Sequence, residues 1–139
     1  MAAAKRRNRK TDHNQMTWAS CPFCHISREP LARNKLAFAI YDAFPVSPGH
    51  ALVIAKRHIN TIFDLDPEEY VACFALVRDV WDLLEARHQT KDFNLGVNCG
   101  EVAGQTIPHA HIHLIPRYAG DVSNPSGGVR HVIPGKGQY

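Results

Sequence analysis

The feature that most constrains the fold is a run of three histidines at alternate positions in "IPHAHIHLIPR" (residues 107–117). Successive side chains of a β-strand point to opposite faces, so a strand over 109–115 places His109, His111 and His113 on one face. The apolar residues between them then point to the other face, where they can be buried. Neighbouring histidines on the polar face lie about 6.5–7 Å apart along the strand. The pattern therefore predicts a sheet with one dry face and one face that carries imidazoles.

Three other apolar stretches supply further strands. Residues 36–41 and 50–56 are apolar and partly β-branched, and two prolines and a glycine break the chain between them. This predicts a hairpin-like pair of strands with a long connection. Residues 93–98 predict another strand, and residues 99–106 form a glycine-bearing loop before the histidine strand.

The clearest helix is expected over residues 66–88. Asp66 suits the N-cap, Pro67 suits the first helical position, and Glu69 follows three residues after the cap. The apolar residues then recur at spacings of three and four: Tyr70, Phe74, Val77, Trp81 and Leu84. This predicts one apolar stripe on a helix of about six turns, with the aromatic side chains in the core.

These elements predict an α+β fold with an antiparallel sheet of about five strands, one long helix packed across it and one short helix. The length of 139 residues fits one domain with a core. We expect a basic flexible arm over 1–17, a globular domain over 18–122 and a Gly/Pro-rich arm over 123–139. The last of these is expected to be an ordered arm or loop without an element of its own.

The positive charge of the chain belongs to the N-terminal arm. The net charge is +3, but five of the sixteen basic residues lie in "AKRRNRK", so eleven basic and thirteen acidic residues remain elsewhere. The body is thus slightly acidic, which disfavours nucleic acid as a partner. A solvated arm is the favoured interpretation of the basic segment, with an arm that binds nucleic acid or an anionic surface as the alternative. No apolar run approaches the roughly 18–20 residues of a membrane span.

The four cysteines are expected to be reduced. Cys21 and Cys24 form a CxxC motif, whereas Cys73 and Cys99 are isolated. The basic arm is not followed by the apolar region of a secretory signal, so a disulfide framework is not expected. We therefore expect a cytoplasmic protein.

Three aligned imidazoles can bind a metal, hold an anion or attack an electrophile. A solvated polar strand face is the alternative, and strict alternation after a Gly-Gln loop disfavours it. At this point "HAHIHLI" resembles the histidine triad (HIT) family, whose pattern is His-x-His-x-His followed by two apolar residues. The resemblance covers roughly residues 20–120, including "FAIYDAFPVSPGHALVIAKRHI" and "NCGEVAGQTIPHAHIHLIPR".

The resemblance implies a nucleotide hydrolase or transferase that acts on phosphorus–oxygen or phosphorus–nitrogen bonds at an α-phosphate. His111 would be the nucleophile and would form a nucleotidyl-histidine, which water then hydrolyses. A neutral imidazole, with a pKa near 6.5, suits this attack. Its second ring nitrogen must donate a hydrogen bond, commonly to a backbone carbonyl, which the sequence does not identify. His113 would contact the phosphate, and Gln105 joins these two as a candidate catalytic residue.

The same resemblance implies a set of nucleotide contacts. Ile40 would lie against the base with help from Phe38, Asp42 would accept from the ribose hydroxyls, and the remaining residues would contact the phosphates or the leaving group. The implied nucleotide-binding residues are Ile40, Asp42, Asn98, Gly104, Gln105, Thr106, His111 and His113. Taken alone, Asp42 is also a plausible turn residue, and Asn98 and Gln105 plausible loop caps.

Similar proteins combine a CxxC with two histidines in a zinc site. The ligands implied here are Cys21, Cys24, His58 and His109, a Cys₂His₂ set that suits tetrahedral zinc. A metal on His109 would lie about 6.5–7 Å or more from His111, so the zinc is expected to be structural. The alternative is a plain reduced CxxC turn. His25 and His50 are spare candidates, and a structural role is favoured for His50.

"AGQT", "LIPR" and "AGD" resemble most closely the branch that hydrolyses dinucleoside polyphosphates. The enzymatic alternatives are a phosphoramidate hydrolase and a diadenosine tetraphosphate phosphorylase, with a DNA deadenylase less favoured. The non-enzymatic alternatives are a nucleotide sensor, which the presence of His111 disfavours, and a small zinc-binding DNA protein. Arg117, Arg130 and Lys136 are candidates for contacts with further phosphates. The resemblance also implies a homodimer whose sheets join edge to edge. Base preference and the choice of water or phosphate as acceptor stay open.

Overall fold

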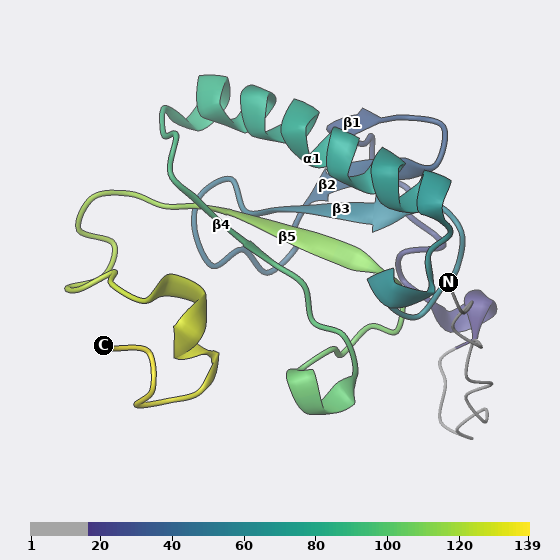
Figure 1. Cartoon of the computed structure of the whole chain (residues 1–139). Coiled ribbons are helices and arrows are strands. Elements are labelled where there is room, and N and C mark those ends of the chain that lie inside the picture. The colour runs from purple at the N-terminus through teal and green to yellow at the C-terminus, as the bar shows by residue number, and fades with distance from the viewer. Residues whose placement is uncertain (1–16) are drawn as a thin grey trace, which may run out of the picture.

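A five-stranded antiparallel sheet and one long helix form the body of the molecule (Figure 1). The computed structural model describes residues 17–139, so the expected basic arm lies outside the described residues except for Thr17. The strand order is β1-β2-β3-β5-β4. The strands are β1 (Ala32–Arg33), β2 (Ala37–Tyr41), β3 (Ala51–Ala55), β4 (Phe93–Gly96) and β5 (His111–Pro116). The predicted α+β class and strand number are confirmed.

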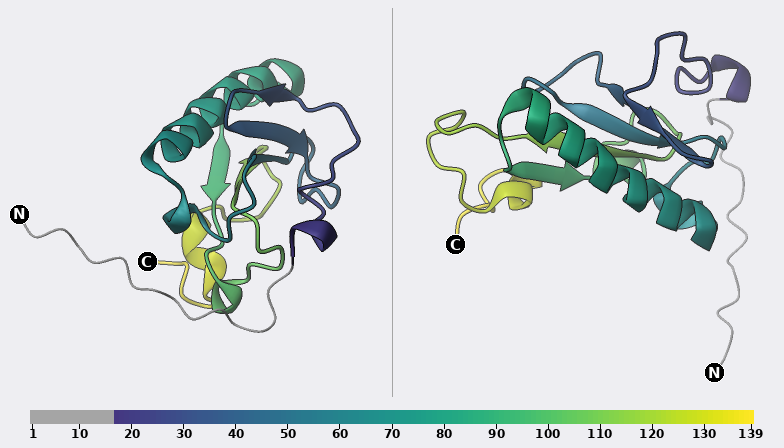
Figure 2. Two further views of the ribbon diagram at one scale, coloured as in Figure 1. Left: turned by 90° about the vertical axis from the view of Figure 1, so that its right-hand side faces the viewer. Right: turned by 90° about the horizontal axis from the view of Figure 1, so that it is seen from above.

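The register of the sheet places the histidines on the face away from the helix. His111 pairs with Ile54, and His113 pairs with Leu52. Helix α1 (Pro67–His88) packs against β1, β2, β3 and β5 on the opposite face (Figure 2). That face is lined by small and branched residues that are fully or almost fully buried: Ala37, Ala39, Ala51, Val53, Ala55, Ile112 and Leu114. The predicted dry face is therefore the face that α1 covers.

Helix α1 begins and ends as its sequence predicts, but its buried stripe differs from the predicted one. Asp66 is the N-cap, and Gln89 ends the helix in the left-handed conformation with φ 54°. The buried residues are Glu69, Cys73, Leu76, Val77, Val80 and Leu84. Tyr70 and Phe74 are 39% and 41% exposed and stack on each other outside the core, so their prediction as core residues was wrong. They lie one position, about 100° of rotation, away from the buried stripe.

Four short 3-10 helices complete the described chain: η1 (Trp18–Ser20), η2 (Ile62–Asp64), η3 (Glu101–Ala103) and η4 (Gly128–Val132). The sequence predicts one short helix and no element after residue 123. Instead, η4 forms within the Gly/Pro-rich segment and packs against β4. Within residues 17–139, no helix combines the length and apolarity needed to cross a membrane.

Glu69 joins the start of α1 to the end of β3, which leads to a pH-dependent prediction. Its carboxylate accepts from Arg57 Nη2 at 2.6 Å and Nε at 3.0 Å, and from the Asp66 backbone N–H at 3.0 Å. Glu69→Gln should lower the free energy of unfolding by about 1–2 kcal/mol at pH 7, because it removes charge-assisted hydrogen bonds. The Arg57 hydrogen bonds lower the pKa of Glu69 below its ordinary 4.5. This stabilisation is therefore present above pH 4.5 and lost as the pH falls through the lower folded-state pKa.

Urea unfolding of wild type and Glu69→Gln at pH 7 and pH 3 measures this difference. The gap between the two proteins should shrink at the lower pH. The matched control is Glu68→Gln, which changes an exposed carboxylate one residue earlier in the same helix. A gap that is equal at both pH values would contradict the assignment.

Candidate active site and metal site

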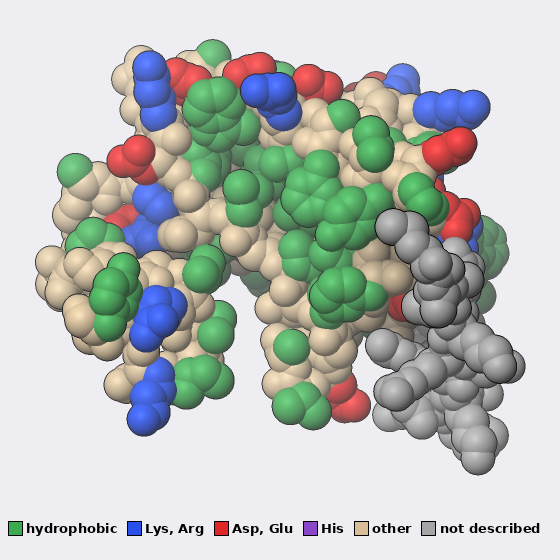
Figure 3. All heavy atoms as spheres, viewed as in Figure 1, with side chains coloured by type: hydrophobic (Ala, Val, Ile, Leu, Met, Phe, Trp, Pro, Cys, Tyr) green, Lys and Arg blue, Asp and Glu red, His purple; other side chains and the backbone are tan. Residues whose placement is uncertain are grey.

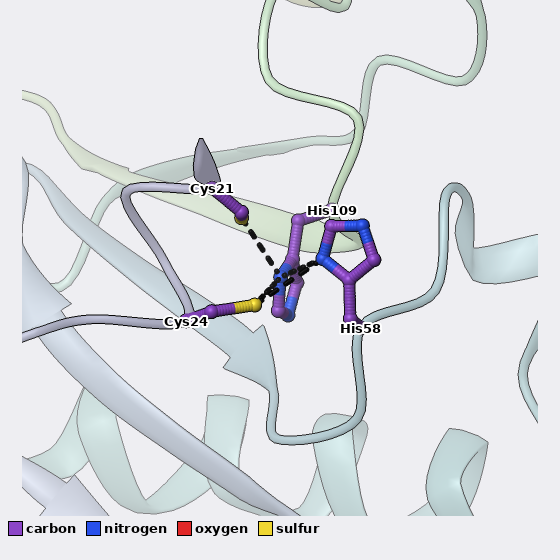
Figure 4. Close-up of side chains that lie close together, drawn as sticks. All are labelled: Cys21, Cys24, His58 and His109. Carbon is purple, nitrogen blue, oxygen red and sulfur yellow. Dashed lines mark hydrogen bonds between the residues drawn. The ribbon is translucent and has the colours of Figure 1, made fainter. Parts of the chain in front are cut away.

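Two cysteines and two histidines meet at one end of the sheet (Figure 4). The CxxC turn supplies Cys21 and Cys24, His58 follows β3, and His109 precedes β5. His109 Nδ1 lies 3.3 Å from Cys21 Sγ, 3.5 Å from Cys24 Sγ and 3.3 Å from His58 Nδ1. Cys24 Sγ and His58 Nδ1 are 3.2 Å apart. These are the four residues that the sequence predicts as metal ligands, and the structure brings all of them together.

The separations and the donor chemistry fit a tetrahedral metal ion. Ligands about 2.0–2.3 Å from one ion at tetrahedral angles stand roughly 3.3–3.8 Å apart. His109 Nε2–H donates to the Ala55 carbonyl at 2.6 Å, so the lone pair of Nδ1 points at the thiols. Burial and the neighbouring Cys21 raise the pKa of Cys24 to about 11, a cost that a bound cation would offset. The group can therefore hold a metal ion.

His111 presents one ring nitrogen as a free electron pair. Its Nδ1 is 2.7 Å from the His109 carbonyl oxygen, and since a carbonyl only accepts, Nδ1 carries the proton. Burial lowers the pKa of His111, which favours the neutral ring at neutral pH. The edge-to-face ring of Phe23, 5.0 Å away between centroids, holds the imidazole in place. Nε2 of His111 thus carries a free electron pair on a neutral, oriented ring, as the predicted nucleophile requires, and the carbonyl that the sequence left open is that of His109.

The proton of His113 is placed by a chain of hydrogen bonds through His50. The Val46 backbone N–H donates to His50 Nδ1 at 3.1 Å, so the proton of the neutral His50 ring is on Nε2. That Nε2–H donates to His113 Nδ1 at 2.9 Å. Burial and the neighbouring imidazoles of His111 and His50 lower the pKa of His113 to about 4. His113 is therefore neutral and carries its proton on Nε2, as a donor.

Asp42 lies beside this pair of histidines. Its Oδ2 is 3.4 Å from His50 Nε2 and 4.0 Å from His113 Nδ1, and its Oδ1 accepts from the Phe44 backbone N–H at 2.9 Å. The donor atoms of these three residues lie within 4.8 Å of one another, a separation that a metal could span. The proton on His50 Nε2 blocks that nitrogen as a ligand, so the hydrogen-bond arrangement argues against a metal at this position.

In the loop before β5, Gln105 and Gly104 bond to the protein backbone, although both were predicted as nucleotide contacts. Gln105 donates to the Asn60 and Ile107 carbonyls at 2.7 and 3.0 Å and accepts from the Gly100 N–H at 2.8 Å. Its amide therefore ties the loop together, as the loop-cap alternative predicts. The Gly104 N–H donates to the Glu101 carbonyl at 2.9 Å, so it is not free for an anion.

The other two predicted residues of this loop differ in their surroundings. Thr106 is exposed to solvent. The side chain of Asn98 is partly exposed and makes no hydrogen bond to the part of the chain that the structure describes. Its amide is therefore available for a ligand.

A cavity of about 290 Å³ lies on the histidine face beside β2, with Arg28, Arg33 and Lys56 in its wall as well as apolar side chains. Phe23, Ile26 and Phe38 line it, with Trp18 at one side. Ile40 is only 1% exposed and belongs to the buried cluster that contains Phe23, so it offers almost no surface to a ligand, and its contact with a base stays a prediction. Phe38 lies on the same face of β2 as Ile40 and lines the cavity. Phe23, Phe38 and Trp18 are the aromatic side chains in the cavity wall.

Sequence reasoning missed two functional candidates. Phe23 lies between the two cysteines, and the turn that brings them together also aims its ring at His111. His50 is the first residue of the second predicted strand. The sequence alone does not show which residue lies beside it in the sheet. Strand alternation would have placed His50 on the same face of the sheet as His113. The two residues are 63 positions apart, however, so the sequence gives no sign that their side chains meet.

Comparisons with known proteins find similar sequences and similar structures. A model of the HIT domain matches residues 25–120. The chain is 41% identical over 98 residues to the asymmetrical bis(5'-nucleosyl)-tetraphosphatase of Schizosaccharomyces pombe, covering 70% of this chain and 54% of that one. It is 29% identical over 121 residues to the AP-4-A phosphorylase of Mycobacterium tuberculosis, covering 82% and 62%. The chain thus spans little more than half the length of these two enzymes.

Solved structures show the same fold. A HIT family protein from Bacillus anthracis superposes with a TM-score of 0.68 at 38% identity, covering 73% of this chain and 75% of that one. The family-model match covers more than half of the chain and includes all three alternating histidines.

Proposed function

The chain belongs to the HIT domain family, and on this premise we propose that it hydrolyses dinucleoside polyphosphates at the α-phosphate through a nucleotidyl-histidine on His111. One observation carries the proposal: a free electron pair on His111 Nε2 stands beside an N–H donor on His113 Nε2. The two ring centroids are 5.1 Å apart on one face of β5. The name of the S. pombe relative supports the same substrate class.

The chemistry follows from these two nitrogens. His111 Nε2 forms a bond to the α-phosphorus, and the bond from that phosphorus to the bridging oxygen breaks, leaving its electron pair on the departing nucleotide. His113 Nε2–H donates to a phosphoryl oxygen, where negative charge gathers in the transition state. Water then attacks the nucleotidyl-histidine, the phosphorus–nitrogen bond breaks, and one proton of the water passes to solvent. Diadenosine tetraphosphate would give AMP and ATP by two easier steps in place of one.

Four further residues are proposed as substrate contacts. Phe38 and Phe23 would contact the base in the cavity that they line. Asp42 would accept from the ribose, since its Oδ2 has only long contacts, 3.4 Å to His50 and 4.0 Å to His113, among residues 17–139. Asn98, with its free amide, would contact the phosphates. Gln105 and Thr106 remain candidates for the leaving group, and Gln105 would have to release its backbone partners first.

The metal group is proposed to hold zinc with a structural role. Zinc prefers the Cys₂His₂ donor set, and bound there it would supply a fixed crosslink between the CxxC turn and the sheet. Both nitrogens of His109 are committed, Nδ1 to the metal group and Nε2 to Ala55, so neither faces a substrate. Thiolate ligands need a reducing compartment, which fits the cytoplasmic location expected from the sequence.

We further propose a homodimer through the free edge of β4. This strand ends the sheet order, and its outer backbone groups have no strand partner within residues 17–139. Figure 3 shows hydrophobic side chains gathered on the face where α1 lies above β4. Leu95 of β4 is 49% exposed, and Tyr70 and Phe74 of α1, which stack on each other, are 39% and 41% exposed. Exposed strand edges and apolar patches of this kind favour association.

A product analysis tests the proposed reaction. The protein is incubated with diadenosine tetraphosphate, with and without inorganic phosphate, and with adenosine 5′-phosphoramidate. AMP and ATP in the absence of phosphate support hydrolysis. ADP that forms only when phosphate is added would identify a phosphorylase, as the M. tuberculosis relative is named. Cleavage of the phosphoramidate alone would indicate the phosphoramidate branch, and binding without any turnover would indicate a nucleotide sensor.

His50 should act as a positioning residue. His50→Ala removes the donor that fixes the His113 tautomer, so kcat should fall by about 10–100-fold, the range seen when orienting partners are removed. KM should change little, because His50 is buried behind His113. His50→Gln retains an N–H donor and should recover part of the loss. Steady-state kinetics of the two variants test this assignment. Equal losses of kcat in His50→Ala and His50→Gln would contradict it.

A further inference from the structure

A second cavity continues the histidine face of the sheet beyond His113. Its volume is about 600 Å³, within the range of ligand sites. Ile115 lies two residues after His113 on the same face of β5, and Asn94 of β4 pairs with Ile115. Both line the cavity. The base cavity, in contrast, lies beside β2, on the other side of the two histidines in the strand order. Two cavities therefore flank one pair of reacting nitrogens.

Hydrogen bonds between separate segments hold the walls of this second cavity. Ser47 Oγ–H donates to the Pro116 carbonyl at 2.7 Å, and Tyr118 O–H donates to the Pro48 carbonyl at 2.5 Å. These two bonds fix the loop before β3 to the end of β5. The opposite wall comes from residues 121–131, which pack against β4 through η4. The cavity is thus built before any ligand arrives.

The charges inside this cavity suit an uncharged ring better than a phosphate. Arg117 is the guanidinium in its wall, and Asp121 accepts from its Nε at 2.7 Å and from its Nη2 at 2.8 Å. Because its guanidinium is paired with Asp121, Arg117 is not free to bind a phosphate. The sequence had suggested Arg117 as a candidate for such a contact. Arg117 Nη1 donates to Asn94 Oδ1 at 2.6 Å. The Asn94 amide nitrogen, without a hydrogen bond among residues 17–139, can donate to an acceptor atom of a heterocycle.

We propose that this second cavity binds the distal nucleoside of a dinucleoside polyphosphate, the nucleoside that leaves with the departing group. The inference rests on the proposed function. Ile115 lies about 13 Å along the strand from His111, a span that a chain of several phosphates can bridge. The first nucleoside would occupy the cavity beside β2, the α-phosphate would lie at the histidines, and the second nucleoside would lie against Ile115 and Asn94. The cavity would therefore select dinucleotides over mononucleoside polyphosphates.

A comparison of two substrates measures how much the distal nucleoside contributes to kcat/KM. Diadenosine tetraphosphate and adenosine 5′-tetraphosphate share the first nucleoside and the phosphate chain, and only the former has a second adenosine. We expect the wild type to show at least a tenfold higher kcat/KM for the dinucleotide. Val122→Trp places an indole in the cavity, and Asn94→Leu removes the amide donor; each should lower that preference about tenfold or more. Neither should change kcat/KM for adenosine tetraphosphate by more than about twofold.

The control is Val129→Trp, which makes the same exchange at an exposed position of η4 that does not line the cavity. It should leave the preference unchanged. Equal kcat/KM values for the two substrates in the wild type would overturn the subsite, as would a preference that both cavity variants retain. If the wild type cleaves neither substrate, the proposed reaction itself fails, which is a separate result. If the wild type cleaves only adenosine tetraphosphate, the result supports the proposed reaction and contradicts the proposed subsite.

Discussion

Replacing His111 with glycine is expected to lower kcat for diadenosine tetraphosphate by at least ~10⁴-fold, with KM within a few fold of the wild type. The variant has no nucleophile, whereas the contacts proposed for the base and the ribose remain. Loss of a covalent catalytic group has effects of this size because the second step, hydrolysis of the intermediate, also disappears. His111 is 8% exposed and its ring packs against Phe23, so some loss of stability is expected as well.

Steady-state kinetics and thermal unfolding of the same samples separate these two effects. Free imidazole should restore part of the activity of His111→Gly, since it can occupy the vacated space and attack the phosphorus. His25→Gly is the matched control, because His25 is exposed and its ring contacts the carbonyl and the ring of Trp18 and neither reacting histidine. A folded His111→Gly protein with near wild-type kcat would exclude the nucleotidyl-histidine.

Removing the metal group is expected to have the largest effect on stability. Cys24→Ser should abolish stoichiometric zinc and lower the free energy of unfolding by several kcal/mol, because bound metal stabilises only the folded arrangement of its ligands. For a chain of this size, that corresponds to a fall in Tm of about 10–20 °C. A strong chelator should produce a similar fall in the wild type and no further fall in the variant.

Metal analysis by mass spectrometry and calorimetry of both proteins measure these effects. Cys99→Ser is the matched control, since Cys99 is a partly buried cysteine outside the metal group. Cys99→Ser should bind zinc, and the chelator should lower its Tm as much as it lowers the Tm of the wild type. A purified wild type that carries no metal, and whose Tm does not respond to the chelator, would refute the structural zinc.

The strand and helix patterns were predictable because they depend on local periodicity. Alternation over residues 109–115 placed His111 and His113 on one face, and the cap at Asp66 located the start of α1. The assignment of Tyr70 and Phe74 to the core failed for a physical reason. Several apolar residues surround the helix axis, and only the packing of α1 on the sheet decides which stripe is buried.

The site was only partly predictable. The four metal ligands are of characteristic types at characteristic places in the sequence, and the structure brings them together. The sequence left two uses of Gln105 open, a phosphate contact or a loop cap, and did not indicate that Ile40 is buried. The Gln105 amide bonds the backbone of Asn60, Ile107 and Gly100, and Ile40 is buried in a cluster with Phe23 of the CxxC turn.

The sequence by itself determined the histidine face, the boundaries of α1 and the family, and it singled out the four residues that could hold a metal, since these depend on residue types in recognisable patterns. Only the tertiary structure decided the protonation pattern of the two reacting histidines. The proton of His113 depends on a chain that begins at the Val46 N–H and passes through His50, 63 residues away. Hydrogen-bond direction is a property of atoms in contact, and contacts between distant segments exist only after the sheet has formed.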